Sequence, residues 1–106
     1  MSISEELKRV ADYYGYEEQS NQLIEECAEL IQAINKYRRA SGKGQPIADF
    51  QKTLVLDNLI EEIADVEVML EQIKYLLNIS EDDIADVKLN KSVRQQARIQ
   101  ASIQRE

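Results

Sequence analysis

Apolar residues recur in two long runs of this chain at alternating steps of four and three. The first run lies within Glu17 to Ala40 and has these residues at Leu23, Cys27, Leu30, Ile34 and Tyr37. The second lies within Thr53 to Leu77 and has them at Leu59, Ile63, Val66, Leu70, Ile73 and Leu77. This spacing puts side chains on one face of an α-helix. Because both runs share it, we predict two long helices that pack side by side.

Weaker patterns flank the two long runs. Ser4, with two acids directly after it, predicts a short leading helix or hook that Gly15 interrupts. Ser80, also followed by acids, predicts the start of a last helix that extends to about Gln104. The expected fold is all-α, a four-helix-type bundle made of a short leading helix and three longer helices and completed by oligomerisation.

Turn-forming sequence separates the two long helices. Gly42, Gly44 and Pro46 are expected to stop the first one, because glycine caps a helix end and proline cannot continue a helix. Residues 47–53 are predicted to be a connecting loop or partial turn, of a length that suits antiparallel helices.

Composition narrows the class of protein. A chain of 106 residues, 43% of them apolar, predicts one globular domain over residues 1–106. The net charge of −7 argues against nucleic acid as a partner, since binding phosphates needs an excess of Lys and Arg. The absence of His removes the usual zinc and di-iron sites, and a lone Cys27 cannot form an intrachain disulfide.

Nothing along the chain predicts a membrane segment. The amino terminus is acidic and polar, unlike a signal peptide, and no apolar run approaches the length of a membrane span. Together with the single cysteine, this favours a soluble protein in the reducing cytoplasm.

An acidic motif occurs in both long runs. The segments LIEECAEL (23–30) and LIEEIADV (59–66) are identical at five of eight positions. Each places two acids three residues apart, Glu26 with Glu29 and Glu62 with Asp65, and this spacing puts both on one helix face. If the helices are antiparallel with the motifs level, four carboxylates converge.

Four converging carboxylates predict a metal site. Their mutual repulsion in a half-buried cleft needs a cation to offset it, and oxygen ligands alone select Mg²⁺ or Mn²⁺. Acids at this spacing are also common on solvated helix faces, and duplication of a structural helix would repeat them. The repeated register relative to the apolar residues favours the site.

Polar residues near the motifs are candidates for binding a phosphorylated substrate. Gln22 and Lys36 share the Glu26 face, and Asn58 lies one turn before Glu62. A basic row on the last helix would meet the outer phosphates of a triphosphate, and consists of Lys88, Lys91, Arg94 and Arg98. Any of these cations can equally be a plain surface charge. Three early tyrosines, Tyr13, Tyr14 and Tyr16, either stack on a base or pack in the core.

In these residues the chain resembles the all-α NTP pyrophosphatase superfamily, in particular its small MazG-like members. The family signature is EExxE followed by ExxD on the next long helix. Here it is matched by Glu25-Glu26-Cys27-Ala28-Glu29 and by Glu62-Ile63-Ala64-Asp65. The resemblance covers roughly residues 15–98. It implies Mg²⁺-dependent cleavage of a nucleoside triphosphate between the α and β phosphates, which gives the monophosphate and pyrophosphate.

The resemblance also implies roles for single residues. Glu26, Glu29, Glu62 and Asp65 would be the metal ligands, and Glu25 would orient or deprotonate the attacking water. Glu61 holds the equivalent place in the second motif, so the general base stays open between these two. A homodimer or homotetramer is expected. The chain lacks the Trp and His that some relatives place near the base, so the preferred nucleotide is open.

Two other classes of protein compete with the enzyme. A non-enzymatic helical interaction module would also explain the apolar runs and the polar tail. A di-iron carboxylate protein is disfavoured, because the helix sites of such bundles use Glu-x-x-His.

Overall fold

The computed structural model describes residues 3–41 and 49–105. These residues form three helices and no strand, namely α1 (Glu5–Ala40), α2 (Asp49–Leu77) and α3 (Glu81–Arg105). The predicted all-α fold is confirmed. Contacts divide the chain into one unit that ends at Leu77 and another that starts at Asn78, and each unit is described by itself.

The first helix combines the predicted leading helix with the first long run. Ser4 caps it, accepting a hydrogen bond from the Leu7 amide at 3.2 Å, and the helix ends at Ala40 as predicted. Gly15 interrupts it with φ 82° and ψ 172°, values that lie in a region open almost solely to glycine. The predicted hook is therefore the part of α1 that precedes Gly15.

The second helix begins earlier than predicted. It starts at Asp49, so residues 49–53 are helical and their prediction as a loop is wrong. The reason is local, since Pro46 is the last residue here that breaks a helix and an acid suits the first turn. The predicted stop at residues 42–46 and the start of the loop lie outside the described residues. At its other end α2 stops at Leu77, and Asn78 follows with a left-handed φ of 55°.

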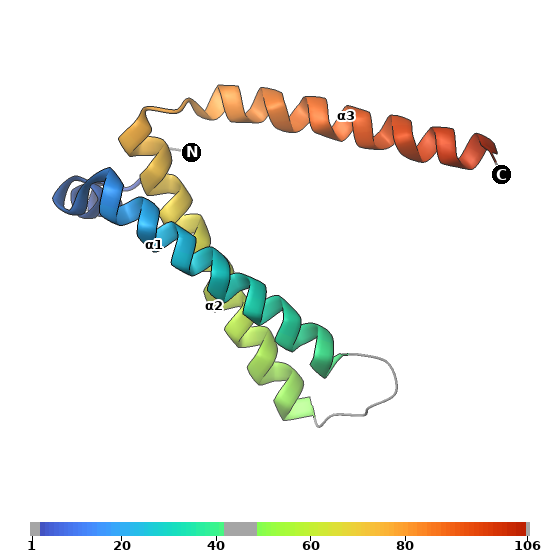
Figure 1. Cartoon of the computed structure of the whole chain (residues 1–106), viewed down its shortest axis with the longest axis horizontal. Helices are drawn as coiled ribbons and strands as arrows, with labels where there is room; N and C mark the ends of the chain where they lie inside the picture. The colour runs from blue at the N-terminus through green and yellow to red at the C-terminus, as the bar shows by residue number, and fades with distance from the viewer. Residues whose placement is uncertain (1–2, 42–48, 106) are drawn as a thin grey trace. The chain divides into compact units, whose positions relative to one another are not determined.

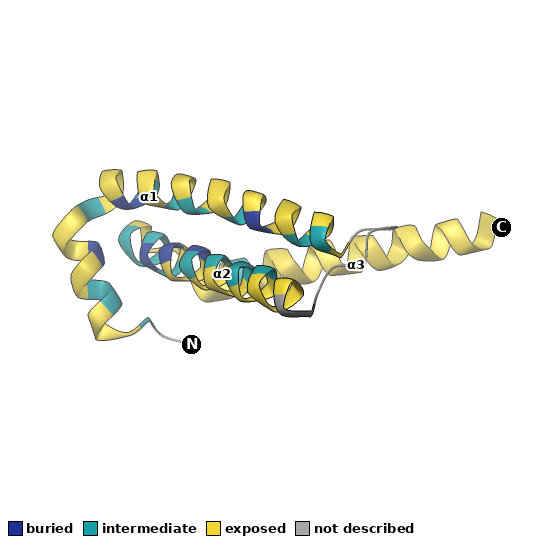
Figure 2. Ribbon diagram, turned by 90° about the horizontal axis from the view of Figure 1, so that it is seen from below, coloured by how far each residue is buried: buried dark blue, intermediate teal, exposed yellow. Residues whose placement is uncertain are grey.

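The helices α1 and α2 pack side by side as an antiparallel hairpin (Figure 1). Figure 2 shows the buried positions of α1 on the side that faces α2. After Gly15, and apart from Ser20, the buried or half-buried positions of α1 recur at steps of four and three, but only some of them are predicted seam residues: Gln19, Leu23, Glu26, Leu30, Ala33, Tyr37 and Ala40. We call these positions, with their counterparts on α2, the contact face.

The predicted apolar seam is only half right. Leu23, Leu30 and Tyr37 lie on the contact face of α1, and Leu59, Val66 and Ile73 lie on that of α2. The other predicted seam residues are exposed, namely Cys27, Ile34, Ile63, Leu70 and Leu77. At 100° per residue, the contact face of α1 is turned by about 50° from the predicted seam, toward the acidic residues.

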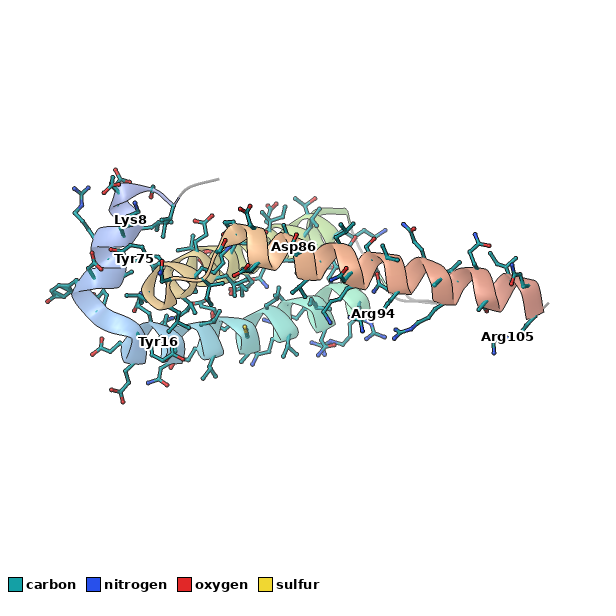
Figure 3. All side chains as sticks on the ribbon, turned by 90° about the horizontal axis from the view of Figure 1, so that it is seen from above. Lys8, Tyr16, Tyr75, Asp86, Arg94 and Arg105 are labelled. Carbon is teal, nitrogen blue, oxygen red and sulfur yellow. The ribbon has the colours of Figure 1, made fainter. Side chains whose placement is uncertain are left out.

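The hook contacts the C-terminal part of α2 through polar side chains and one buried alanine. Ala11 is fully buried, and the side chain of Gln72 donates a hydrogen bond to the Leu7 carbonyl at 3.2 Å. The Tyr75 hydroxyl lies 2.9 Å from both carboxylate oxygens of Asp12. The Lys8 ammonium lies 5.9 Å from the centre of the Tyr75 ring (Figure 3). These contacts fix the direction of the chain before Gly15.

The second unit is essentially α3. The Ser80 hydroxyl accepts a hydrogen bond from the Asp82 amide at 3.1 Å, which confirms the predicted cap. The helix continues to Arg105, one residue beyond the prediction, and none of its residues is buried. Among the described residues, no helix is both long and apolar enough to cross a membrane.

Candidate functional site

The two acidic motifs meet across the α1–α2 hairpin. One carboxylate oxygen each of Glu26, Glu62 and Asp65 lies within 4.8 Å of the others. The fourth acid, Glu29, is close enough to Glu62 for its charge to raise the pKa of Glu62. Three of the four acids that the sequence predicts as metal ligands thus form one cluster, and the fourth lies beside it.

Packing explains why these acids converge. Glu26 and Glu62 occupy the contact face, in positions that a purely apolar pattern would give to aliphatic side chains. Glu29 and Asp65 stand beside them, both displaced toward the same side of the hairpin. The acids therefore form a layer that begins between the helices and opens on one side. We call that side the acidic face, and it is formed by Glu25, Glu29, Asp57, Glu61 and Asp65.

Hydrogen bonds satisfy only some of the carboxylate oxygens in this layer. The side-chain amide of Gln22 donates to Oε1 of Glu26 at 2.8 Å. Oε2 of Glu26 and Oε2 of Glu62 are both shielded from solvent, and neither has a hydrogen-bond partner among the described residues. A shielded carboxylate oxygen without a donor is costly, so these two atoms require a proton or a cation.

The acids also raise one another's affinity for protons. Loss of surrounding water raises the pKa of Glu62, and the charges of Glu29, Asp65 and Glu26 raise it further. The pKa of Asp65 is raised by the same loss of water, and by the charge of the nearby Glu26 carboxylate. Both shifts have the sign expected of acids gathered in a partly shielded cluster.

A divalent cation fits this cluster. Mg²⁺ binds oxygen ligands at about 2.1 Å, so two ligands of one ion lie at most about 4.2 Å apart. The three clustered oxygens lie within 4.8 Å, and a small contraction once their repulsion is offset would bring them into this range. Carboxylate oxygens are the donors that Mg²⁺ and Mn²⁺ prefer. The site thus offers the ligand type that the predicted metal prefers, at a spacing that needs a small contraction.

The other predicted residues of the hairpin lie on the same two helices as the cluster. Glu25 and Glu61 are both exposed on the acidic face, so the structure does not rank them as general base. Asn58 is half-buried one turn from Glu62, and Lys36 is exposed two turns beyond Glu29. Gln22, predicted to bind substrate, donates its hydrogen bond to a carboxylate of the cluster, so its amide also orients Glu26.

The basic row and the tyrosines are separated from the acids along the sequence. Lys91, Arg94 and Arg98 line a shallow hollow on α3, and Lys88 precedes them by one turn. They belong to the second unit, so their contact with a bound phosphate stays a prediction. Tyr13, Tyr14 and Tyr16 are exposed around the Gly15 break, and the rings of Tyr13 and Tyr14 meet edge to face. The base-stacking role of these tyrosines also stays a prediction.

A buried polar pair escaped the sequence prediction. The side chain of Gln19 donates to Oε1 of Gln72 at 2.7 Å, and Gln72 is 1% exposed. The signal was available, because Gln19 precedes Leu23 by four residues and Gln72 follows Met69 by three, which continues the steps of the contact face. This pair links the same two helices that carry the acids.

Comparisons with known proteins leave the function to the site itself. Protein-family models, curated proteins and solved structures gave no match to the chain.

Proposed function

We propose that the protein is a Mg²⁺-dependent nucleoside triphosphate pyrophosphohydrolase. It would cleave the bond between the α and β phosphates of an NTP or dNTP and release the monophosphate and pyrophosphate, in the manner of an enzyme that cleans the nucleotide pool. The observation that carries the proposal is the cluster of Glu26, Glu62 and Asp65, in which one oxygen of Glu26 and one of Glu62 are shielded and lack donors. Glu29 stands beside it and acts on Glu62. The type of reaction is inferred from the motifs EExxE and ExxD, in which the chain resembles MazG-like enzymes.

Each residue of the site has a distinct task in this proposal. The four acids would hold Mg²⁺, with Mn²⁺ as a substitute, and Gln22 keeps Glu26 oriented. When bound, the ion would supply the positive charge that polarises the α phosphate and lowers the pKa of a water. Glu25 or Glu61 accepts the proton of the attacking water from the acidic face. Lys36 and Asn58, which belong to the same unit as the acids, would hold the phosphates and stabilise the leaving pyrophosphate.

The setting of the enzyme follows from its substrate. Nucleoside triphosphates and free Mg²⁺ occur together in the cytoplasm, where a single unpaired Cys27 stays reduced, so we place the protein there. We also expect a homodimer or a homotetramer, and the reaction needs neither nucleic acid nor a membrane as partner.

An assay of released pyrophosphate tests the activity. The purified protein is incubated with Mg²⁺ and a panel of NTPs and dNTPs, and pyrophosphate and monophosphate are measured together. Glu62→Gln should lower turnover by more than the roughly 10- to 100-fold that loss of an outer partner of a metal site costs. Glu67→Gln is the matched control, because Glu67 is an exposed glutamate on the same helix outside the cluster. Lack of turnover on every member of the panel would overturn the proposal.

A helical interaction module remains the second candidate, and the exposed aliphatic residues of the hairpin favour it. Ile24 is 67% exposed and Ile31 is 60% exposed. Such a module would bind its partner equally well with and without Mg²⁺, and Glu26→Gln would leave that binding unchanged. The pyrophosphohydrolase instead requires both the ion and Glu26.

A further inference from the structure

Charge is distributed unevenly along this chain. Residues 87–105 hold five of its 13 Lys and Arg and none of its 20 Asp and Glu, so they carry +5 and the rest of the chain −12. The net charge of −7 therefore argues against an anionic partner for the hairpin but not for α3. At physiological ionic strength a charge acts over about 8 Å, so a bound partner responds to the charges beside it rather than to the total.

The cations of this segment lie on one side of α3. At 100° per residue, the four cations of the basic row and Arg105 fall within about 120° of the helix circumference. From Lys88 onward, the only other residues of the sequence in this arc are Gln95 and Ser102. The arc thus holds neither an acid nor a large apolar residue, and we call it the cationic side of α3.

Three of these cations lie close together and are not neutralised. Lys91, Arg94 and Arg98, with Gln95, line one shallow hollow on α3. All four residues are exposed, and within the described part of α3 no acid forms an ion pair with the three cations. Like charges at such spacing repel one another. An anion bound over the hollow would offset that repulsion, and all four side chains have N–H groups to donate to it.

The span of the cationic side indicates a polymer rather than a small anion. Lys88 and Arg105 are 17 residues apart, which is about 26 Å along the helix. A free phosphate or triphosphate over the hollow reaches only the three cations that line it. A nucleic acid presents its phosphates in series, one per about 1.7 Å of duplex axis, and can contact all five cations at once. Each further contact releases counterions and so adds to the affinity.

The composition of the cationic side favours nucleic acid over an acidic protein. Interfaces between proteins are anchored by large apolar or aromatic side chains, and this side has none from Lys88 onward. Interfaces between proteins and nucleic acids are more polar and carry more positive charge. Arg, Lys, Gln and Ser, the residue types present here, are among the usual donors to phosphate oxygens.

A lipid surface is a poorer match for α3. A helix that lies on a membrane buries a broad apolar face, commonly with aromatic residues in it. The side of α3 opposite the cations has Leu89, Val93 and Ile103, but Gln96 and Gln100 lie among them, and the helix contains no aromatic residue. Inserting this side into lipid would take the two amides out of water without partners.

We propose that the cationic side of α3 binds the phosphate backbone of a nucleic acid, without regard to base sequence. Contacts to phosphates position a nucleic acid, whereas contacts to base edges select a sequence, and this side offers chiefly the first kind. None of its residues belongs to the hairpin, and the binding needs no metal. The proposal therefore does not depend on the pyrophosphohydrolase.

Fluorescence anisotropy of a labelled, mixed-sequence DNA duplex tests the binding. The full-length protein is titrated in chelator, so that metal plays no part, and the titration is repeated at several salt concentrations. The logarithm of the affinity should fall with that of the salt concentration with a slope of about −2.7 to −4.5, as three to five phosphate contacts require. Lys91→Gln, Arg94→Gln and Arg98→Gln together should weaken binding at about 50 mM salt by at least about a hundredfold, and should flatten the slope.

The matched control removes the same charge from the hairpin. Arg9→Gln, Arg38→Gln and Arg39→Gln together change the net charge equally, and all three residues are exposed on α1. This variant should bind within a few fold of the wild type and keep its salt slope, because the cationic side of α3 is intact.

Two neighbouring glutamines of α3 give a second comparison that leaves every cation in place. Gln95→Glu puts an acid in the hollow and should weaken binding. Gln96→Glu adds the same charge outside the cationic side and should weaken binding less. Circular dichroism should show the same helix content in all variants, since glutamine and glutamate are good helix formers.

Competition decides which polyanion this side of α3 takes. Unlabelled duplex DNA, single-stranded DNA and RNA should displace the probe, and the most effective of them identifies the kind of nucleic acid. Four results would overturn the proposal. These are no binding of any nucleic acid at low salt, a triple α3 variant that binds as the wild type does, an α1 control that loses binding equally, and tighter binding of polyaspartate or of anionic lipid vesicles.

Discussion

Glu62 is the residue at which stability and the proposed function oppose each other. It occupies a contact position, its Oε2 lacks a donor, and three acids surround it. In the absence of metal, such a carboxylate destabilises the fold that positions it. A residue of this kind is expected where a protein holds a ligand, because binding sites retain groups that the fold alone would not favour.

Glu62→Gln should therefore stabilise the metal-free protein while removing its response to Mg²⁺. The amide has nearly the shape of the acid but carries no charge, so the repulsion from Glu29, Asp65 and Glu26 is lost. The unfolding temperature is measured with a chelator and again with Mg²⁺. We expect the variant to melt above the wild type in chelator and to shift little with Mg²⁺. Glu67→Gln, outside the cluster, should behave as the wild type in both conditions.

The pH dependence of stability should also show that the ionised acids destabilise the metal-free fold. Because the pKa of Glu62 and the pKa of Asp65 are raised by folding, the folded chain binds protons more readily than the unfolded chain does. The free energy of unfolding of the metal-free protein therefore falls as the pH rises from the ordinary carboxyl range through the raised values. Denaturant unfolding at a series of pH values measures it. Glu62→Gln should flatten this slope, and parallel curves for variant and wild type would contradict the assignment.

At the scale of elements, Gly15 separates the hook from the long part of α1. Its φ of 82° with ψ of 172° belongs to a region that side chains disfavour. A Cβ added there would meet no atom within 4 Å, so any penalty comes from the backbone alone. Without this break, the helix would continue straight and Ala11 and Asp12 would leave α2.

Gly15→Ala should lower the free energy of unfolding by about 1–3 kcal/mol. Denaturant unfolding measures the loss, and Glu18→Ala is the control because Glu18 is exposed within a regular part of the same helix. A variant that keeps wild-type stability would mean that the hook tolerates release from α2, in which case the Tyr75 hydrogen bond to Asp12 should be lost as well.

The course of the contact face shows where sequence reasoning succeeded and where it could not. Helix positions followed from the spacing and from Ser4, Gly15 and Ser80, all of which act locally. The direction of the contact face did not, because each helix carries apolar residues on two sides and the strongest pattern runs between them. Cys27 and Ile34 fitted that pattern yet are exposed, while Glu26 did not fit it and is half-buried. A single stripe cannot reveal that only some of its members face the neighbouring helix.

The acids themselves were predictable for a different reason. Their signal was the repetition of Glu26 and Glu29 as Glu62 and Asp65. Any antiparallel pairing that places the two motifs side by side brings these acids together. What the sequence could not supply was the relation of the basic row on α3 to the acids, since no pattern within Lys88 to Arg98 specifies the surface that it meets.

For the whole molecule, binding of Mg²⁺ should stabilise the fold that gathers the acids. Mg²⁺ should raise the unfolding temperature of the wild type and of Ile63→Lys with the same midpoint concentration, as followed by thermal melting in a Mg²⁺ titration. Ile63 is 40% exposed and is none of the four acids, so its substitution removes no ligand. A Glu62→Gln variant that keeps the wild-type midpoint would contradict the site.

The hydrogen bond between Gln19 and Gln72 has a consequence for the alignment of the two helices. The residue numbers of this pair add up to the same total as those of Glu26 and Asp65, so both pairs belong to one register of the hairpin. Sliding one helix along the other by a single turn, about 5.4 Å, would break the glutamine pair and part the acids together. The glutamine pair thus favours the one alignment of the two helices in which the acids also meet.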